Sequence, residues 1–325
     1  MATTAKGKLF YADAEKGYII KVAIDTLAIS MSRTDFKVSK KGLFHRGADG
    51  NKHILFDIEF PRNSFAVYEC RKEFEFSVNL KHFQKMVRNV KKKDSIILFI
   101  EKGKKDKLGI VIKPSGATSG RNTRLETVYI AITDAEPELE DDLPEKHIDA
   151  NGNEVDVYGY PMIIEASDFQ KLKKMASVGK IVSVEMQQNN YISFYSDFGQ
   201  LYSSRLEFGE IVDDPEMEEE SEEESEEESE EEKESDDDEI KGWYEAEFHM
   251  SIFNLLLKLP GLCTHMQFYS PKVERYPLKI SMKAGTLGKV TTYIKDARQI
   301  AIEDAQRRQL RETEEGISTS SSRKK

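Results

Sequence analysis

A weak internal repeat of strand–helix–strand units constrains this chain of 325 residues more than any other feature. Three units begin at Phe74, Pro161 and Tyr244, and each combines a strand pattern, a helical pattern and a second strand pattern. A looser fourth unit begins near Lys8, with a helix expected over 16–29. Because such units bury their apolar faces only by packing together, we predict an α+β chain of two similar domains.

Changes in composition give the expected boundaries. We predict an N-terminal domain over 8–133, a connecting loop over 134–158, a C-terminal domain over 159–295 and an extension over 296–325. An acidic insertion, 213–241, interrupts the second domain. Its densest part, 216–239, holds 18 acids and one lysine, a charge of −17, so the rest of the chain carries −11 + 17 = +6. Like charges with nothing apolar to bury predict a disordered, solvated segment.

The helix expected from Leu80 carries two stripes. Its apolar stripe of Leu80, Phe83 and Val87 is typical of a helix that faces a core. A second stripe is cationic, consists of Lys81, Lys85, Arg88 and Lys92, and has no acid on that helix. The equivalent helices of the other repeats are also interpreted as basic without acids. Lysines on a single helix are usually exposed to solvent and have no binding role. Aligned basic helices would instead form a cationic track for phosphates, and binding there would be independent of base sequence and sensitive to salt.

The order and spacing of these units resemble the proliferating cell nuclear antigen family of sliding clamps. The resemblance covers about 8–295 and is clearest over 47–112, 163–207 and 276–294. The first of these includes the stretch FSVNLKHFQKMVRNVKKKDSIILFIE, and the last reads YPLKISMKAGTLGKVTTYI. The acidic insertion and the C-terminal tail are additions to the family pattern. They indicate a divergent member, such as one from a large DNA virus.

The resemblance implies a fold and a function. Two sliding-clamp domains per chain and three chains per ring would place helices along a channel and antiparallel sheets outside. The chain would be a non-enzymatic processivity factor that encircles double-stranded DNA and tethers replication and repair proteins, with a DNA polymerase and a clamp loader as partners. It would act in the nucleus, or in a cytoplasmic replication factory if viral. The implied DNA-binding residues are Lys21, Lys81, Lys85, Arg88, Lys171, Lys174 and Lys258.

Two further sites follow from the same resemblance. The ring would close by antiparallel pairing of edge strands within 124–133 and 199–208. The implied subunit-interface residues are Val128, Ile130, Ile132, Tyr202, Ser204 and Leu206. Partners with PIP-box-like peptides would insert a short helix into an apolar pocket. The implied pocket residues are His53, Leu139, Leu143, Pro277 and Tyr293.

Other sequence features narrow the alternatives. The six histidines show no metal-binding spacing, and no phosphate-binding glycine motif or nucleophile–base arrangement occurs, so neither a cofactor nor a metal is expected. The two cysteines are far apart, and no apolar run is long enough to span a membrane. Two alternatives stay open at this point: a clamp-fold processivity factor that works as a monomer or dimer, and an acidic interaction protein of the histone-chaperone type.

Overall fold

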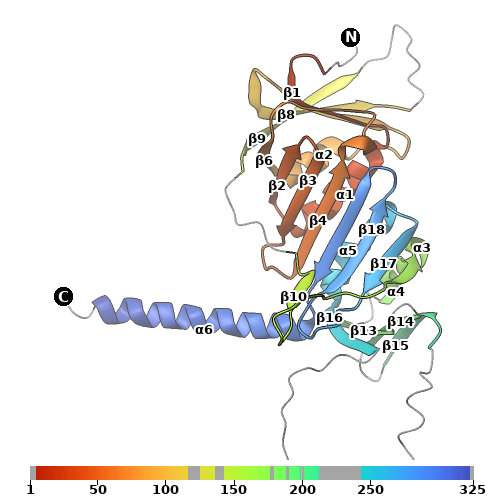
Figure 1. Cartoon of the computed structure of the whole chain (residues 1–325), viewed down its shortest axis with the longest axis vertical. Coiled ribbons are helices and arrows are strands. Elements are labelled where there is room, and N and C mark those ends of the chain that lie inside the picture. The colour runs from red at the N-terminus through yellow and green to blue at the C-terminus, as the bar shows by residue number, and fades with distance from the viewer. Residues whose placement is uncertain are drawn as a thin grey trace, which may run out of the picture.

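The computed structural model describes residues 5–115, 125–135, 143–175, 179–187, 190–197, 199, 201–211 and 243–322, with backbone alone at 126 and 310–322. The acidic insertion and Leu139 lie outside the described residues. The described chain is an α+β molecule of two similar halves, stacked along its longest axis (Figure 1). The fold class predicted from the repeat is therefore confirmed. No described helix combines the length and the apolarity that a membrane crossing requires.

The N-terminal half runs from β1 to β9. Its elements are β1 (Lys8–Ala14), α1 (Gly17–Ser30), β2 (Arg33–Ser39), β3 (Gly42–Ala48), β4 (Ile54–Pro61), the 3₁₀ turn η1 (Arg62–Ser64), β5 (Val67–Cys70), β6 (Phe74–Asn79), α2 (Leu80–Val87), β7 (Ser95–Glu101), β8 (Lys104–Lys113) and β9 (Glu126–Asp134). A small hairpin of β10 (Lys146–Ile148) and β11 (Glu154–Asp156) follows in the connecting segment.

The C-terminal half repeats this order. Its elements are β12 (Met162–Glu165), α3 (Ala166–Phe169), α4 (Leu172–Met175), β13 (Ile181–Gln187), β14 (Tyr191–Asp197), β15 (Ser203–Gly209), β16 (Trp243–His249), α5 (Met250–Leu256), the 3₁₀ turn η3 (Leu259–Gly261), β17 (His265–Tyr269), β18 (Leu278–Ala284) and β19 (Gly288–Ile294). Helix α6 (Ala297–Ser322) ends the chain. Its first turn is closed by a reciprocal pair of hydrogen bonds, since Asp296 accepts from Gln299 N and donates its own N–H to the Gln299 side chain.

Strand order shows that the two halves share one topology. The sheet β15-β14-β13-β16 of the C-terminal half has the same order as β4-β3-β2-β6 of the N-terminal half. The other sheets, β19-β18-β17-β12 and β9-β8-β7-β1, correspond in the same way. The two halves join where β19 pairs antiparallel with β4 along six residues, from Lys289–Glu59 to Ile294–Ile54. One sheet therefore continues from one half into the other (Figure 1).

The helices form because their apolar residues recur at helical spacing. In α2, Leu80, Phe83 and Val87 are buried, and the Asn79 side chain caps the helix by accepting a hydrogen bond from His82 N at 3.0 Å. Helix α1 is buried on almost every side, and its Gly17 lies so close to β7 that a Cβ there would be 2.9 Å from the backbone nitrogen of Ile96. Glycine is therefore required where α1 begins.

The first helix of the C-terminal half differs from the expected single helix. It is divided into two short segments, α3 and α4, joined by hydrogen bonds of the i to i−3 type such as Lys171 N to Asp168 O at 2.9 Å. The buried residues Phe169, Leu172 and Met175 recur every three positions, which is the period of a 3₁₀ helix and explains the tighter winding.

The core of the C-terminal half depends on Phe253 of α5. Its side chain is 1% exposed, and its ring centroid lies 5.6 Å from that of Phe248, 6.0 Å from that of Phe194 and 6.4 Å from that of Phe169. We predict that Phe253→Ala lowers the free energy of unfolding by about 3–5 kcal/mol, measured by urea denaturation. The exposed neighbour Asn254→Ala should change it by less than about 0.5 kcal/mol. Equal effects would contradict this packing.

Candidate nucleic-acid interface

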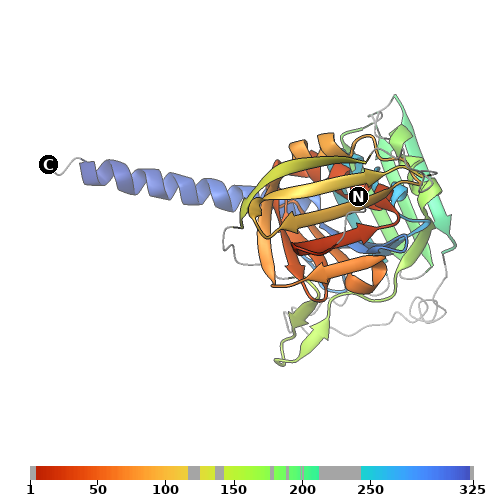
Figure 2. The same cartoon turned by 90° about the horizontal axis from the view of Figure 1, so that it is seen from above.

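All helices of the two halves except α6 form one layer against the sheets. Figure 1 shows β2, β3, β4 and β18 in front with α1, α2 and α5 behind them. Helix α1 contacts α2, α5 and η3, and η3 contacts α3, so the layer is continuous from one half to the other. Seen from above, the neighbouring strands β9, β8, β7 and β1 of the N-terminal half lie nearest the viewer (Figure 2). Cations on the outer side of this layer therefore belong to a single surface.

Most of the predicted DNA-binding residues are exposed on this layer. Lys81 and Lys85 lie on α2, Arg88 follows at its C-terminal end, and Lys258 follows α5. All four are exposed, and none forms a salt bridge within the described part of the chain. Lys171 and Lys174 are exposed around α4. The surface thus offers cations whose charge is available to an anionic ligand.

Two of the predicted residues are paired with acids, which corrects the expectation that these helices lack them. Lys21 lies 2.7 Å from Asp25 one turn along α1, and Gln84 of α2 donates to the other oxygen of Asp25 at 3.1 Å. This network joins α1 to α2, so Lys21 is part of the helix packing. Lys171 lies 2.6 Å from Asp168 at the surface, where such a pair contributes little stability.

The predicted DNA-binding set left out several exposed cations near these helices. Lys92 belongs to the cationic stripe expected from the sequence, Lys91 and Lys93 flank it, and Lys173 lies on α4; all are exposed. The run of three consecutive lysines that begins four residues after the end of α2 is the sequence feature that could have identified the other two. They extend the cationic surface beyond the end of α2.

Two strands in the described structure have one partner where their structural counterparts have two. Residues 126–131 of β9 pair only with β8, and β15 pairs only with β14. Their counterparts, β19 and β4, pair with each other. In Figure 1, β9 lies near one end of the long axis and β15 near the other. The described chain therefore has two unlike strand edges with backbone groups left for a further strand.

The predicted interface residues at each edge are two positions apart, so they share one face of the chain there. Ile130 and Ile132 are 5% and 6% exposed because they pack into the protomer's own core, with Val128 partly buried beside them. The side chain of Tyr129 on the outer face is 42% exposed instead. On the other edge, Tyr202 is 60% exposed, while Ser204 and Leu206 are half-buried.

The predicted partner pocket is occupied by the connecting segment. Tyr293 is only 2% exposed and forms a cluster with Val157 and Tyr158, against which Leu143 packs. The Tyr158 hydroxyl donates to Pro277 O at 2.7 Å. His53 is half-buried nearby, where its carbonyl accepts from Lys295 N. In this structure, Tyr293 is therefore a packing residue beneath the segment, and it is not open to a ligand.

A lysine–glutamate pair fixes the connecting segment to the sheet. Lys279 of β18 donates to both oxygens of Glu145, at 2.7 and 2.8 Å, and its Nζ lies 5.0 Å from the ring centroid of Tyr158. The Tyr293 hydroxyl also donates to Glu145. Burial raises the pKa of the Glu145 carboxyl, but the Lys279 and Tyr293 hydrogen bonds and the Lys279 charge outweigh burial, so its pKa is lowered.

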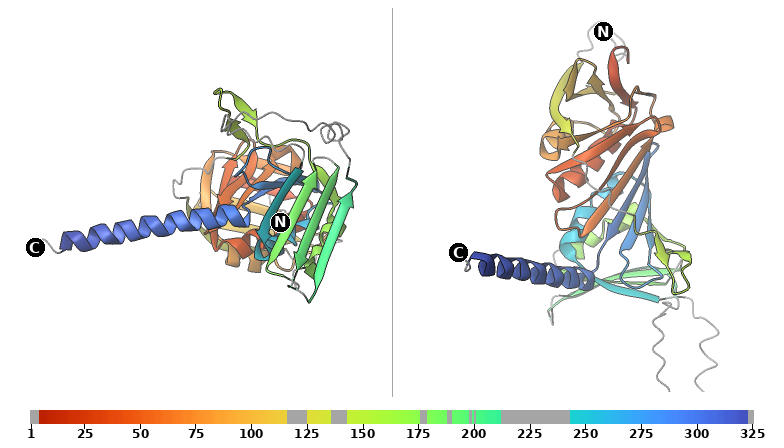
Figure 3. Two further views of the ribbon diagram at one scale, coloured as in Figure 1. Left: turned by 90° about the horizontal axis from the view of Figure 1, so that it is seen from below. Right: turned by 60° about the vertical axis from the view of Figure 1, so that its left-hand side comes forward.

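Helix α6 leaves the body on the side of this connecting segment. Ile300 is buried against the core, and Lys295 lies 2.5 Å from Glu303. Arg307 donates to Asn51 O at 3.0 Å, next to the turn that precedes β4. Beyond these contacts the helix extends away from both sheets (Figure 3). The predicted C-terminal extension thus contains a helix that is anchored at its first turns.

The Glu145–Lys279 pair predicts how the connecting segment responds to charge. Glu145→Gln should leave Lys279 without a counter-charge and weaken docking of the segment by about 1–2 kcal/mol, less than a fully buried pair because Glu145 keeps 35% exposure. Cleavage within 143–158 by a limiting protease should then accelerate. The matched surface change Glu154→Gln should not accelerate it.

The same pair fixes the direction of a pH effect. Because the pKa of Glu145 is lowered in the folded state, its contribution is complete above the ordinary carboxyl pKa of about 4.3 and is lost as pH falls through the lowered value. Acid should therefore release the segment in the native chain but change little further in Glu145→Gln. An equal acid response in both proteins would contradict this assignment.

Three comparisons place the chain among known sequences. A family model described as proliferating cell nuclear antigen, N-terminal domain, matches residues 9–135. The chain is 24% identical to the DNA polymerase sliding clamp of Nitrosopumilus maritimus over 276 residues, covering 85% of this chain and 93% of that protein. It is 26% identical over 217 residues to DNA polymerase sliding clamp 1 of Pyrobaculum aerophilum, covering 64% and 82%.

The structural comparison extends over both halves. A crystal structure of proliferating cellular nuclear antigen from Entamoeba histolytica matches with a TM-score of 0.64, covering 89% of this chain and 99% of that chain. Sequence identity in this match is 14%, so the likeness is one of fold. It includes the C-terminal half, which the family model does not reach.

Proposed function

We propose that this chain, a divergent member of the proliferating cell nuclear antigen family, is a DNA sliding clamp that closes into a homotrimeric ring around duplex DNA. It would act as a polymerase processivity factor and tether replication and repair proteins. A clamp loader would open the ring, and proteins with PIP-box-like peptides would bind it. The nucleus, or a viral replication factory, is the expected place of action. The named relatives are polymerase clamps, which supports a tether without catalytic chemistry of its own.

The observation that carries this proposal is the pair of unpartnered edges. Within one chain, β19 and β4 join the two halves by backbone hydrogen bonds. The equivalent strands β9 and β15 hold the corresponding places in the strand order but lie at opposite ends of the protomer. Pairing β15 of one protomer with β9 of the next would repeat the internal junction. Unlike edges of this kind generate a ring when the rotation closes.

The internal junction also predicts the register of that pairing. Pro61 pairs with the first residue of β3, and Gly209 pairs with the first residue of β14, so β15 matches β4 with an offset of 209 − 61 = 148. Ile112 of β8 and Met282 of β18 occupy equivalent positions. Ile112 pairs with Glu126 and Met282 pairs with Val290, so β19 matches β9 with an offset of 290 − 126 = 164. Leu55 pairs with Tyr293. The expected intersubunit pair is therefore Ser203 with Tyr129.

The helix layer would then line the channel. Ring closure through the sheets leaves the helices of every half on one side, where Lys81, Lys85 and Arg88 would meet phosphates. Contacts of this type do not depend on base sequence, so they would permit movement along the duplex. The ring would prevent dissociation by encirclement, without tight contacts. Lys171, Lys174 and Lys258 would extend the track, and Lys21 would support it through the α1–α2 packing.

The proposed register can be tested by cross-linking. Residues opposite each other on antiparallel strands have Cα atoms about 4.5–5.5 Å apart, which suits a disulfide. Tyr129→Cys/Ser203→Cys should give covalent trimers on a non-reducing gel, and the native chain should have a solution mass of about three times 37.2 kDa. Tyr129→Cys/Glu207→Cys, four residues out of register, should not cross-link. A monomeric mass at micromolar protein concentration would rule out the trimeric ring.

The channel surface can be tested by reversing its charge. Lys81→Glu/Lys85→Glu should abolish most stimulation of a polymerase on a loaded circular template, because like charges would face the phosphates. Stability should be unchanged, since both side chains are exposed. The matched reversal Lys272→Glu/Lys283→Glu removes the same charge from exposed lysines outside the helix layer. If both variants lose stimulation equally, the loss reflects net charge and the channel assignment fails.

A further inference from the structure

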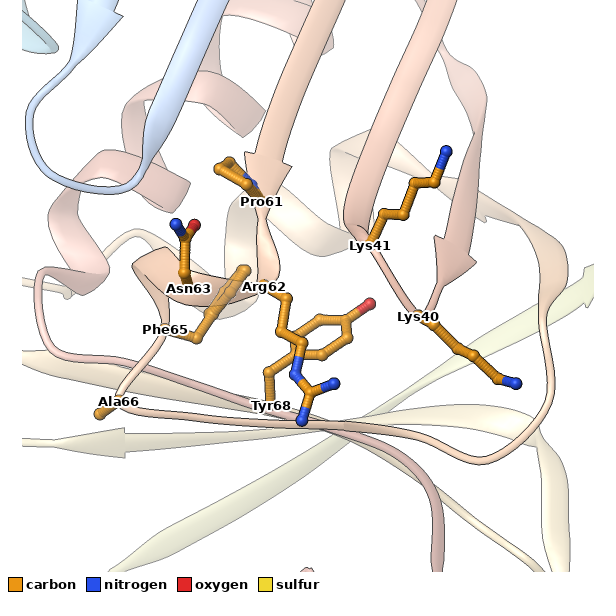
Figure 4. Close-up of a pocket in the computed structure, with 8 residues that line it drawn as sticks. All are labelled: Lys40, Lys41, Pro61, Arg62, Asn63, Phe65, Ala66 and Tyr68. Carbon is orange, nitrogen blue, oxygen red and sulfur yellow. The ribbon is translucent and has the colours of Figure 1, made fainter.

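A separate pocket of about 560 Å³ lies at the far end of β4 from the connecting segment (Figure 4). The turn between β2 and β3 forms one wall with Lys40 and Lys41, and η1 forms the other with Arg62. A smaller pocket of about 190 Å³ adjoins it, shares Lys40, Arg62 and Tyr68, and adds Arg71. With a strand rise of about 3.4 Å, β4 separates this pocket from the His53 end by roughly 24 Å.

Four cations converge on these two pockets. Lys40, Lys41, Arg62 and Arg71 are all exposed, and none forms a salt bridge within the described part of the chain. Glu69 lines the smaller pocket, and the Glu73 carboxylate accepts a hydrogen bond from the backbone N–H of Lys40. The cations outnumber these acids by two. The combined cleft therefore has a positive rim that is not neutralised internally.

The floor of the pocket is apolar and held in place. Phe65 and Tyr68 are each 7% exposed, with ring centroids 5.3 Å apart. The Tyr68 hydroxyl lies 2.8 Å from Ser39 O and 2.6 Å from Gly42 O, so it supports the turn that carries the lysines. Arg62 N donates to Lys41 O at 2.7 Å, which joins the two walls. Figure 4 shows Tyr68 between Arg62 and Lys40.

The internal repeat indicates that this pocket is not a by-product of the fold. The equivalent of the β2–β3 turn in the C-terminal half is the turn from Gln187 to Tyr191, whose sequence is QQNNY. It has no cation where the N-terminal half has Lys40 and Lys41. Strand β15 is followed by Glu210, at the place where β4 is followed by Arg62. The cationic pocket therefore belongs to one half alone.

We propose that this pocket binds an acidic peptide segment of a partner protein, with an apolar side chain on the Phe65–Tyr68 floor and carboxylates against Lys40, Lys41, Arg62 and Arg71. Charge complementarity selects the acidic class, because two walls of cations face one cleft. The apolar floor selects a peptide over a nucleic-acid backbone, which presents phosphates and sugars but no apolar group of that size. The cations proposed for DNA lie on the helix layer instead.

The preformed geometry supports peptide binding without rearrangement. Because the Tyr68 hydroxyl and the Arg62–Lys41 backbone bond already fix both walls, the backbone need not be ordered when a ligand enters, and the entropy cost is confined to the cationic side chains. The site also lies at the opposite end of β4 from the connecting segment. A partner bound here would leave that segment and the helix layer uncovered, so it could occupy the clamp together with a partner bound at the connecting segment.

The test uses the full chain and a fluorescein-labelled synthetic peptide in which pairs of glutamates alternate with leucine or phenylalanine. Fluorescence anisotropy should show binding that Lys40→Glu/Arg62→Glu weakens by about tenfold or more, as expected for lost charge-assisted contacts. Arg71→Glu should weaken peptide binding less than the double variant does. Because it changes one exposed residue outside the β2–β3 turn, it tests the charge of the pocket without a change in the turn that could disturb folding. Lys81→Glu/Lys85→Glu should bind the peptide as the native chain does.

Unchanged binding in the Lys40/Arg62 variant, or equal binding of a peptide with glutamine in place of glutamate, overturns the proposal. If that variant loses affinity for a DNA duplex as strongly as for the peptide, the pocket is a nucleic-acid site and the proposal fails. If the peptide binds only after residues 216–239 are deleted, the chain's own acidic run holds the pocket and no partner is required. Polymerase stimulation that survives in the variant separates this site from the clamp function.

Discussion

The backbone ladder between β4 and β19 is the interaction on which the rest of the structure depends. It makes one sheet out of two halves and places their helices in a single layer. Unpaired strand edges expose donors and acceptors that favour pairing with another chain. Because each half has the same topology, the ladder that joins β4 to β19 leaves β15 and β9 as its unused counterparts. The proposed assembly would thus repeat the contact that organises the protomer.

Periodicity predicted the fold well because burial follows it in most elements. The stripe of Leu80, Phe83 and Val87 is buried as the spacing indicated, and the N-terminal domain model of the clamp family that repeat order suggested matches residues 9–135. Helix α1 is the exception in pattern, since it is apolar on nearly every side and sits between neighbouring helices. The division into α3 and α4 was missed because a period of three differs little from 3.6 over so few residues.

The candidate sites were less predictable because they depend on contacts between distant segments. The Lys21–Asp25 pair has the i, i+4 spacing of a helical ion pair and could have been predicted. Spacing could not show that Tyr158 and Glu145 would cover Tyr293. It also gave no sign of the pocket formed by Lys40 and Arg62, which lie on separate strand connections. The exposed cations of α2 were predictable because one short amphipathic helix decides their exposure by itself.

Helix α6 makes the two ends of β4 chemically different. It contains 26 residues, about 39 Å of rigid rod, and starts beside the end of β4 that carries the connecting segment. The opposite end of β4 carries the cationic pocket. Two flat sides of the proposed ring would therefore be chemically unlike, one bearing the projecting helices and the other the positive clefts. Such a ring would have a front and a back on the duplex.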